Sequence, residues 1–175
     1  HIMPTLADIV FKCGNHIMTF PPNGTSAVRL NPNHILDLTS GEGRVRFDVS
    51  TLSLSSRDWL SLFIQDWNVQ EQKITDSNIP SSQGNPRNAI HIEQGAGQFQ
   101  SESGHWQIKS FDQNRQMSDP IYQNVIDSVL TRSAMTRTTF KAVINKNGHI
   151  KFWLPTLNYV IAEGNVPPIT WDKGV

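Results

Sequence analysis

Two side chains that often take part in catalysis, His91 and Glu93, lie two positions apart in the segment NAIHIEQG. They alternate with Ile90 and Ile92, and a period of two is that of a β-strand, whose successive side chains point to opposite faces. His91 and Glu93 are therefore expected to share a face opposite the isoleucines. A carboxylate next to an imidazole orients the ring and raises its pKa. We expect this arrangement for His91.

In other alternating segments, the positions that face away from the core hold further polar and aromatic side chains. If these strands were neighbours in one sheet, several such side chains would lie within about 5 Å of one another. The resulting face would hold Arg44, Arg46, Asp48, Trp59, Ser61, Phe63, Gln65, His91, Glu93, Lys141, Val143, Asn145, His149, Lys151 and Trp153. In one interpretation the charges only form cross-strand pairs and the Trp rings only cover the sheet.

In the other interpretation this face is the floor of a binding cleft, because ligand sites combine apolar walls with a few well-placed polar groups. Aromatic rings would stack on sugar rings, and the polar side chains would bind hydroxyl groups. We expect Trp59 and Trp153 to contribute most. The predicted ligand-binding residues are Arg46, Trp59, Gln65, His91, Glu93, Lys141, Asn145 and Trp153.

Catalysis on this face would depend on Asp48, Glu93 and His91, the residues that could donate or accept a proton. The sequence has no phosphate-binding glycine loop, no Gly-x-Ser-x-Gly elbow and no His-Glu-x-x-His pair. The single cysteine, Cys13, excludes an internal disulfide and a zinc site that needs two thiolates of this chain. We expect neither a metal nor a cofactor.

The elements that must position these residues are short strands separated by turns. Strands are predicted over 43–50, 58–66, 89–94, 138–146 and 148–154, and Asn147-Gly148 between the last two is a strong hairpin signal. One core is expected to contain Val45, Phe47, Leu62, Ile90, Ile92, Phe140, Ile144, Ile150 and Phe152.

Two segments depart from the strand pattern. Apolar residues recur at helical spacing after Asp119-Pro120, an N-cap followed by a proline suited to the first helical position, so one short helix is predicted over 119–131. The polar stretch 68–88 is predicted to be a long surface loop. The predicted fold class is all-β: a two-sheet antiparallel jelly-roll sandwich with one short helix.

Length and charge limit the possible functions. The chain has 175 residues, and we expect a cloning remnant at 1–3 and a single domain over 4–175, whose native chain could continue beyond Val175. Its 15 basic and 15 acidic residues balance. A neutral chain gives no electrostatic signal for nucleic acid, and no apolar run approaches the roughly 20 residues of a membrane span.

In architecture, most of the chain resembles the concanavalin A-like lectin and glucanase sandwiches. The resemblance lies in GRVRFDVS (43–50), RDWLSLFI (57–64), NAIHIEQG (88–95) and TTFKAVIN (138–145). It implies a curved sheet whose concave face binds carbohydrate. The Glu-x-Asp-x-x-Glu strand of the glucanases is missing.

The order of three motifs is also similar to that in jelly-roll alginate lyases. The segments of this chain that resemble the three lyase motifs are Arg44-Val45-Arg46, Ala89-Ile90-His91 and Phe140-Lys141-Ala142. Ala89 replaces the family's Gln, and Val143 and Ile144 stand where its Tyr is expected, which removes the proton-transfer group that the resemblance implies.

We therefore expect a non-catalytic carbohydrate-binding or cell-surface recognition module, extracellular or secreted, with a glycan as its partner. The alternatives are a glycan-cleaving enzyme, as a glycoside hydrolase before a polysaccharide lyase, and a structural or adhesion domain of a surface or phage fibre.

Overall fold

The computed structural model describes residues 9–13, 16–20, 36–52, 60–69, 85–95, 105–124 and 135–174. These residues form strands and no helix. The strands are β1 (Ile9–Cys13), β2 (His16–Phe20), β3 (Leu36–Asp37), β4 (Glu42–Leu52), β5 (Leu60–Gln65), β6 (Ala89–Gly95), β7 (His105–Phe111), β8 (Ile121–Tyr122), β9 (Met135–Asn145), β10 (His149–Leu154), β11 (Tyr159–Asn165) and β12 (Lys173–Gly174). In this part of the chain no helix is long and apolar enough to cross a membrane.

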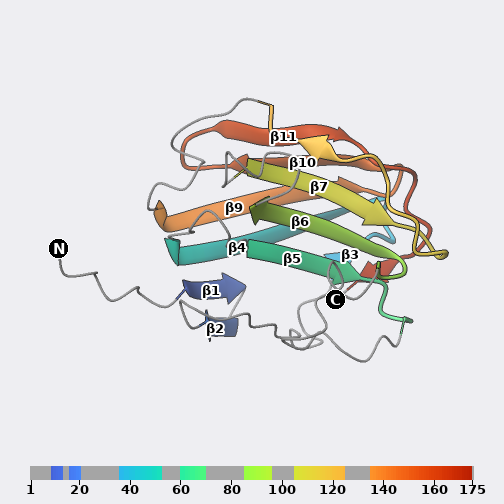
Figure 1. The fold of residues 1–175 in the computed structure, drawn as a ribbon, viewed down its shortest axis with the longest axis horizontal. Coiled ribbons are helices and arrows are strands. Elements are labelled where there is room, and N and C mark those ends of the chain that lie inside the picture. The colour runs from blue at the N-terminus through green and yellow to red at the C-terminus, as the bar shows by residue number, and fades with distance from the viewer. Residues whose placement is uncertain are drawn as a thin grey trace.

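The strands form two larger sheets and one small one. The six-stranded sheet has the order β11-β10-β9-β4-β1-β2, and the four-stranded sheet has the order β5-β6-β7-β8. β12 and β3 make a two-stranded sheet. All pairs are antiparallel. In Figure 1, β5, β6 and β7 lie in front of β4, β9 and β10 as a second layer.

The core lies between the two larger sheets. Trp106 of β7 contacts Phe140 of β9 and Phe152 of β10, with ring centroids 5.0 Å apart in each pair. Every residue of the predicted core belongs to this cluster, with Val45 and Leu62 packed against it as partly buried members. The prediction of an all-β, sandwich-like fold is confirmed; the jelly-roll topology stays a prediction.

The Asn147-Gly148 hairpin is also confirmed. The turn over 146–148 joins β9 to β10, and Gly148 has a φ of 101°, a conformation that residues with a Cβ rarely adopt. The Gly148 amide donates to the Asn145 carbonyl at 2.9 Å.

The helix predicted from residue 119 is wrong in the part that the structure describes. Ile121 and Tyr122 form β8, which pairs with Gln107 and Ile108 at the edge of β7. Ile121 is buried in the core, so pairing and burial override the helical spacing. Residues 125–131 of that prediction, and 70–84 of the predicted loop, lie outside the described residues.

Candidate functional site

The residues predicted to share one face lie on two different sheets. β4, β9 and β10 belong to the six-stranded sheet, whereas β5 and β6 belong to the four-stranded sheet. Because the core lies between these sheets, side chains that point away from it point in opposite directions. The expectation of a single face is therefore wrong.

The outer face of the four-stranded sheet brings together three of the predicted residues, Gln65, His91 and Glu93. Cross-strand register adds two residues that sequence reasoning missed: Lys109 lies opposite His91, and Gln107 lies opposite Glu93. The alternation of Gln107 and Lys109 with the core residues of β7 could have revealed them. We call His91, Glu93, Gln107 and Lys109 the Glu93 cluster.

Glu93 is the centre of this cluster. Its Oε1 lies 3.0 Å from the Lys109 Nζ and accepts a hydrogen bond from the Gln107 Nε2. The Glu93 side chain is 9% exposed and that of Lys109 is 14% exposed. The pair is thus largely removed from water but still reaches the surface. Gln65 lies opposite Ala89, two residues before His91, and donates from Nε2 to the Arg87 carbonyl at 3.0 Å.

His91 is fully buried within the cluster, with 0% of its surface exposed. Its ring stacks on that of Phe63, with centroids 3.9 Å apart. The His91 Nε2 lies 3.4 Å from the Glu93 Oε2, but neither ring nitrogen has a hydrogen-bond partner in the described part of the chain.

The pKa of His91 lies well below its usual 6.5, first because burial disfavours the imidazolium and second because the Lys109 ammonium repels it. The expectation that Glu93 raises this pKa is wrong. The imidazole is neutral at pH 7, so His91 makes no ion pair with Glu93.

The outer face of the six-stranded sheet carries the other described residues of the predicted site. Arg46 lies opposite Lys141, and Lys141 lies opposite Trp153. The Lys151 Nζ lies over the Trp153 ring, 5.1 Å from its centroid. Asn145 and His149 lie on the same face at the hairpin end of β9 and β10. The His149 Nε2 lies 2.9 Å from the Glu163 Oε2.

The structure does not bring the proposed catalytic groups together. Asp48 lies in β4, opposite Thr139, whereas Glu93 and His91 lie in the four-stranded sheet. The three lyase-like motifs are divided in the same way, because Arg46 and Lys141 are neighbours but His91 lies in the other sheet. Trp59 lies outside the described residues.

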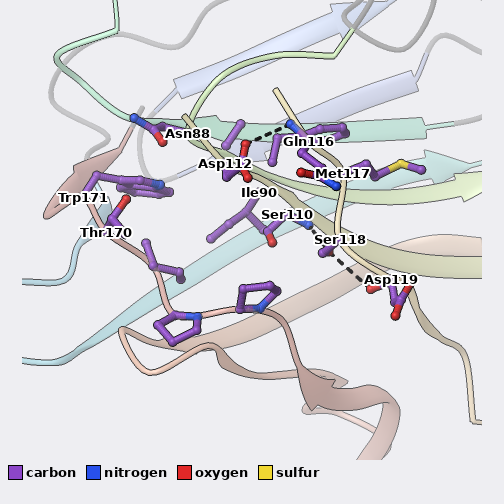
Figure 2. Close-up of a pocket in the computed structure, with 15 residues that line it drawn as sticks. Asn88, Ile90, Ser110, Asp112, Gln116, Met117, Ser118, Asp119, Thr170 and Trp171 are labelled. Atoms are coloured by element: carbon purple, nitrogen blue, oxygen red, sulfur yellow. Dashed lines mark hydrogen bonds between the residues drawn. The ribbon is translucent and has the colours of Figure 1, made fainter. Parts of the chain in front are cut away.

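A second candidate site is a pocket of about 390 Å³ at the end of β6 and β7 (Figure 2). Its walls come from the start of β6, the end of β7, the turn after β7 and the segment before β12. The described lining residues are Asn88, Ala89, Ile90, Ser110, Phe111, Asp112, Gln116, Met117, Ser118, Asp119, Pro167, Pro168, Ile169, Thr170 and Trp171. None of them was predicted as a site residue, because loops distant in sequence form the pocket.

Neither site suggests a metal centre. In the described ranges no group of three or more His, Cys, Asp or Glu side chains is placed to hold a metal ion. Comparison of the chain with protein-family models, curated proteins and solved structures found no match.

Proposed function

We propose that this chain is a non-catalytic carbohydrate-recognition module of an extracellular protein, and that it binds glycan at the Glu93 cluster beside the Phe63 ring. The observation that carries the proposal is the contact of Glu93 with both Lys109 and Gln107 on a face that points away from the core. The cluster offers a carboxylate acceptor, an ammonium donor and an amide side by side. Sugar hydroxyl groups, which both donate and accept hydrogen bonds, match such a set.

The energetics of the cluster favour a role in binding over a role in stability. Removing an ion pair from water costs as much as its attraction gives back, so a buried pair is weak evidence for stabilisation. His91 adds two ring nitrogens without partners in the described part of the chain, and such groups carry a desolvation penalty. A sheet face that only needed covering would be more stable with apolar side chains.

The Phe63 ring supplies the apolar part of the proposed surface. It is half-buried and held in place by its stack on His91. A fixed aromatic ring beside directional polar groups is the combination found in small-ligand sites. His91, the cross-strand partner of Phe63, is a positioning residue for this ring.

The proposal is tested by applying the purified chain to a glycan array and assaying reducing-end release from every glycan bound. Binding without release is expected. Glu93→Gln and Lys109→Met should each weaken binding about tenfold or more, because each removes a charge-assisted hydrogen bond.

The matched controls are Glu163→Gln and Lys151→Met, a cross-strand pair on the outer face of the six-stranded sheet. These variants should keep the parent affinity, and thermal unfolding of all four separates lost binding from lost folding. Release of reducing ends would overturn the non-catalytic proposal in favour of a glycan-cleaving enzyme. If no glycan on the array is bound, the proposal is overturned in favour of a structural domain.

A further inference from the structure

The pocket at the end of β6 and β7 contains no residue of the Glu93 cluster, although the ring of one lining residue, Phe111, stacks on His91 with centroids 6.5 Å apart. Ile90 and Ser110, which line the pocket, are cross-strand partners, as are His91 and Lys109 of the Glu93 cluster. Successive residues of a strand face opposite sides of the sheet, so the two pairs point in opposite directions. An inference about the pocket therefore stands without the proposed function.

Asn88 gives the pocket an unused hydrogen-bond acceptor. Its Nδ2 lies 3.4 Å from the Asp66 Oδ2. Because an ionised carboxylate only accepts, this contact fixes the amide with its NH₂ group toward Asp66. The Asn88 Oδ1 is then buried, and it has no hydrogen-bond partner in the described part of the chain. A ligand that brings a donor to this buried acceptor would satisfy it.

The charge of the lining also favours a ligand that donates. Two carboxylates, Asp112 and Asp119, line the pocket, and no Lys, Arg or His is among the described lining residues. The Asp112 Oδ1 accepts from the amides of Asn114 and Gln116 at 2.8 and 2.9 Å, which holds the turn in shape. Arg115 of the same turn does not line the pocket, and its Nη1 donates to the Asn85 carbonyl at 2.9 Å.

The remaining wall is suited to a ring. Trp171 is buried to 7% exposure, and it lines the pocket together with Pro167 and Pro168. Figure 2 shows Trp171 and Asn88 on one side of the pocket, Asp112 beside them, and Ser118 and Asp119 on the opposite side. An aromatic face attracts cations as well as apolar surface. The volume of about 390 Å³ is at the lower end of the range for small-molecule sites, which suits a single ring.

We propose that this pocket binds one amino-sugar residue in its protonated form. An ammonium group has three donors and no acceptor, which matches the Asn88 oxygen and the Asp112 carboxylate. The sugar ring lies against Trp171, and Ser110 and Thr170 of the lining offer hydroxyl groups to the sugar. The Ser118 hydroxyl already accepts from the Ser110 amide and donates to the Asp119 carbonyl.

Three sugars that differ at one substituent test the proposal: glucosamine, N-acetylglucosamine and glucose, titrated into the isotope-labelled chain below the pKa of the amine. Glucosamine should shift the side-chain amide signals of Asn88 and Gln116 and the indole signal of Trp171. It should bind about tenfold more tightly than glucose, the value of one charge-assisted hydrogen bond.

Asp112→Asn keeps the oxygen that holds the turn and removes the charge, so it should abolish the preference for glucosamine. The matched control is Glu163→Gln, which also removes one negative charge, but from a carboxylate that contacts His149 and does not line the pocket. Should Asp112→Asn not fold, raising the pH through the pKa of the amine in the parent chain should remove the same preference.

Equal affinity for glucose and glucosamine would overturn the proposal, as would a preference that survives Asp112→Asn and the rise in pH. Tighter binding of Nα-acetyl-lysine methylamide than of glucosamine would also overturn it, and would assign the pocket to a lysine side chain. Glu93→Gln should leave glucosamine binding unchanged, so failure of one proposal is distinguishable from failure of the other.

Discussion

His91 is neutral in this fold because burial and the Lys109 ammonium both lower its pKa. The neutral ring stacks on Phe63 at 3.9 Å and lies within 6.5 Å of Phe111, measured between ring centroids. The residue therefore behaves as an aromatic packing group that still carries two nitrogens. In the unfolded chain the same imidazole is free to take up a proton near pH 6.5.

This difference predicts that acid destabilises the fold through His91. Because the folded-state pKa is depressed, the unfolded chain binds more protons below about pH 6.5, so stability is full above that pH and falls as the pH decreases. One such group contributes a slope of up to about 1.4 kcal/mol per pH unit. Urea unfolding between about pH 7.5 and 5 measures it. His91→Phe should remove this part of the slope, whereas Phe63→Leu should retain it. An unchanged slope in His91→Phe would contradict the assignment.

At the scale of elements, the β9–β10 hairpin fastens the segment that forms one wall of the pocket. The Val166 amide donates to the Gly148 carbonyl at 2.9 Å, and the Ile169 amide donates to the Lys146 carbonyl at 2.8 Å. Lys146 also forms an ion pair with Asp172. The turn thus sets the path of the chain from Val166 to Trp171.

Two glycines with similar backbone angles test this role of the hairpin. Gly41 and Gly148 have φ values of 95° and 101°; a Cβ at Gly41 would meet nothing within 4 Å, whereas one at Gly148 would lie 2.0 Å from the Val166 oxygen. Gly41→Ala should cost about 1–3 kcal/mol of unfolding free energy from backbone strain alone.

Gly148→Ala should cost more than Gly41→Ala, because the Val166 backbone must also move. Denaturant unfolding measures both variants, and equal losses would contradict a close approach at Gly148. Because the displaced segment leads into the pocket wall, only Gly148→Ala should also weaken glucosamine binding.

The same hairpin shows which elements a sequence predicts. Asn147-Gly148 determines its turn through the φ of its own glycine, so the hairpin was predictable from local chemistry. The segment after Asp119-Pro120 was not, because the partner of β8 is the edge of β7, and no local pattern shows that this edge is open. Pairing with the edge of β7 selects one of the two conformations that the local sequence allows.

At the scale of the whole molecule, alternation determines which side chains face the core but not which sheet a strand joins. Val45 pairs with Ala142, far along the chain, and this pairing places β4 beside β9 and away from β6. The core was therefore predictable, whereas the surface predicted to contain both Arg46 and His91 was divided. The pocket was beyond the reach of sequence patterns, since its walls meet only when the sheets are packed.

The division of the predicted surface gives a final prediction about binding. Trp153 and Lys141 lie on the outer face of the six-stranded sheet, and the core separates them from the Glu93 cluster. Packed sheets are about 10 Å apart, and a side chain removed from one outer face has no contact through which to alter the other.

Trp153→Ala and Lys141→Gln should each change glycan affinity by less than about twofold, well below the tenfold loss expected for Glu93→Gln. Titration of each variant with the tightest-binding glycan of the array measures this. A tenfold loss in Trp153→Ala with Glu93→Gln unaffected would instead place the glycan on the six-stranded sheet, where a Trp ring and three basic side chains, Arg46, Lys141 and Lys151, would receive it.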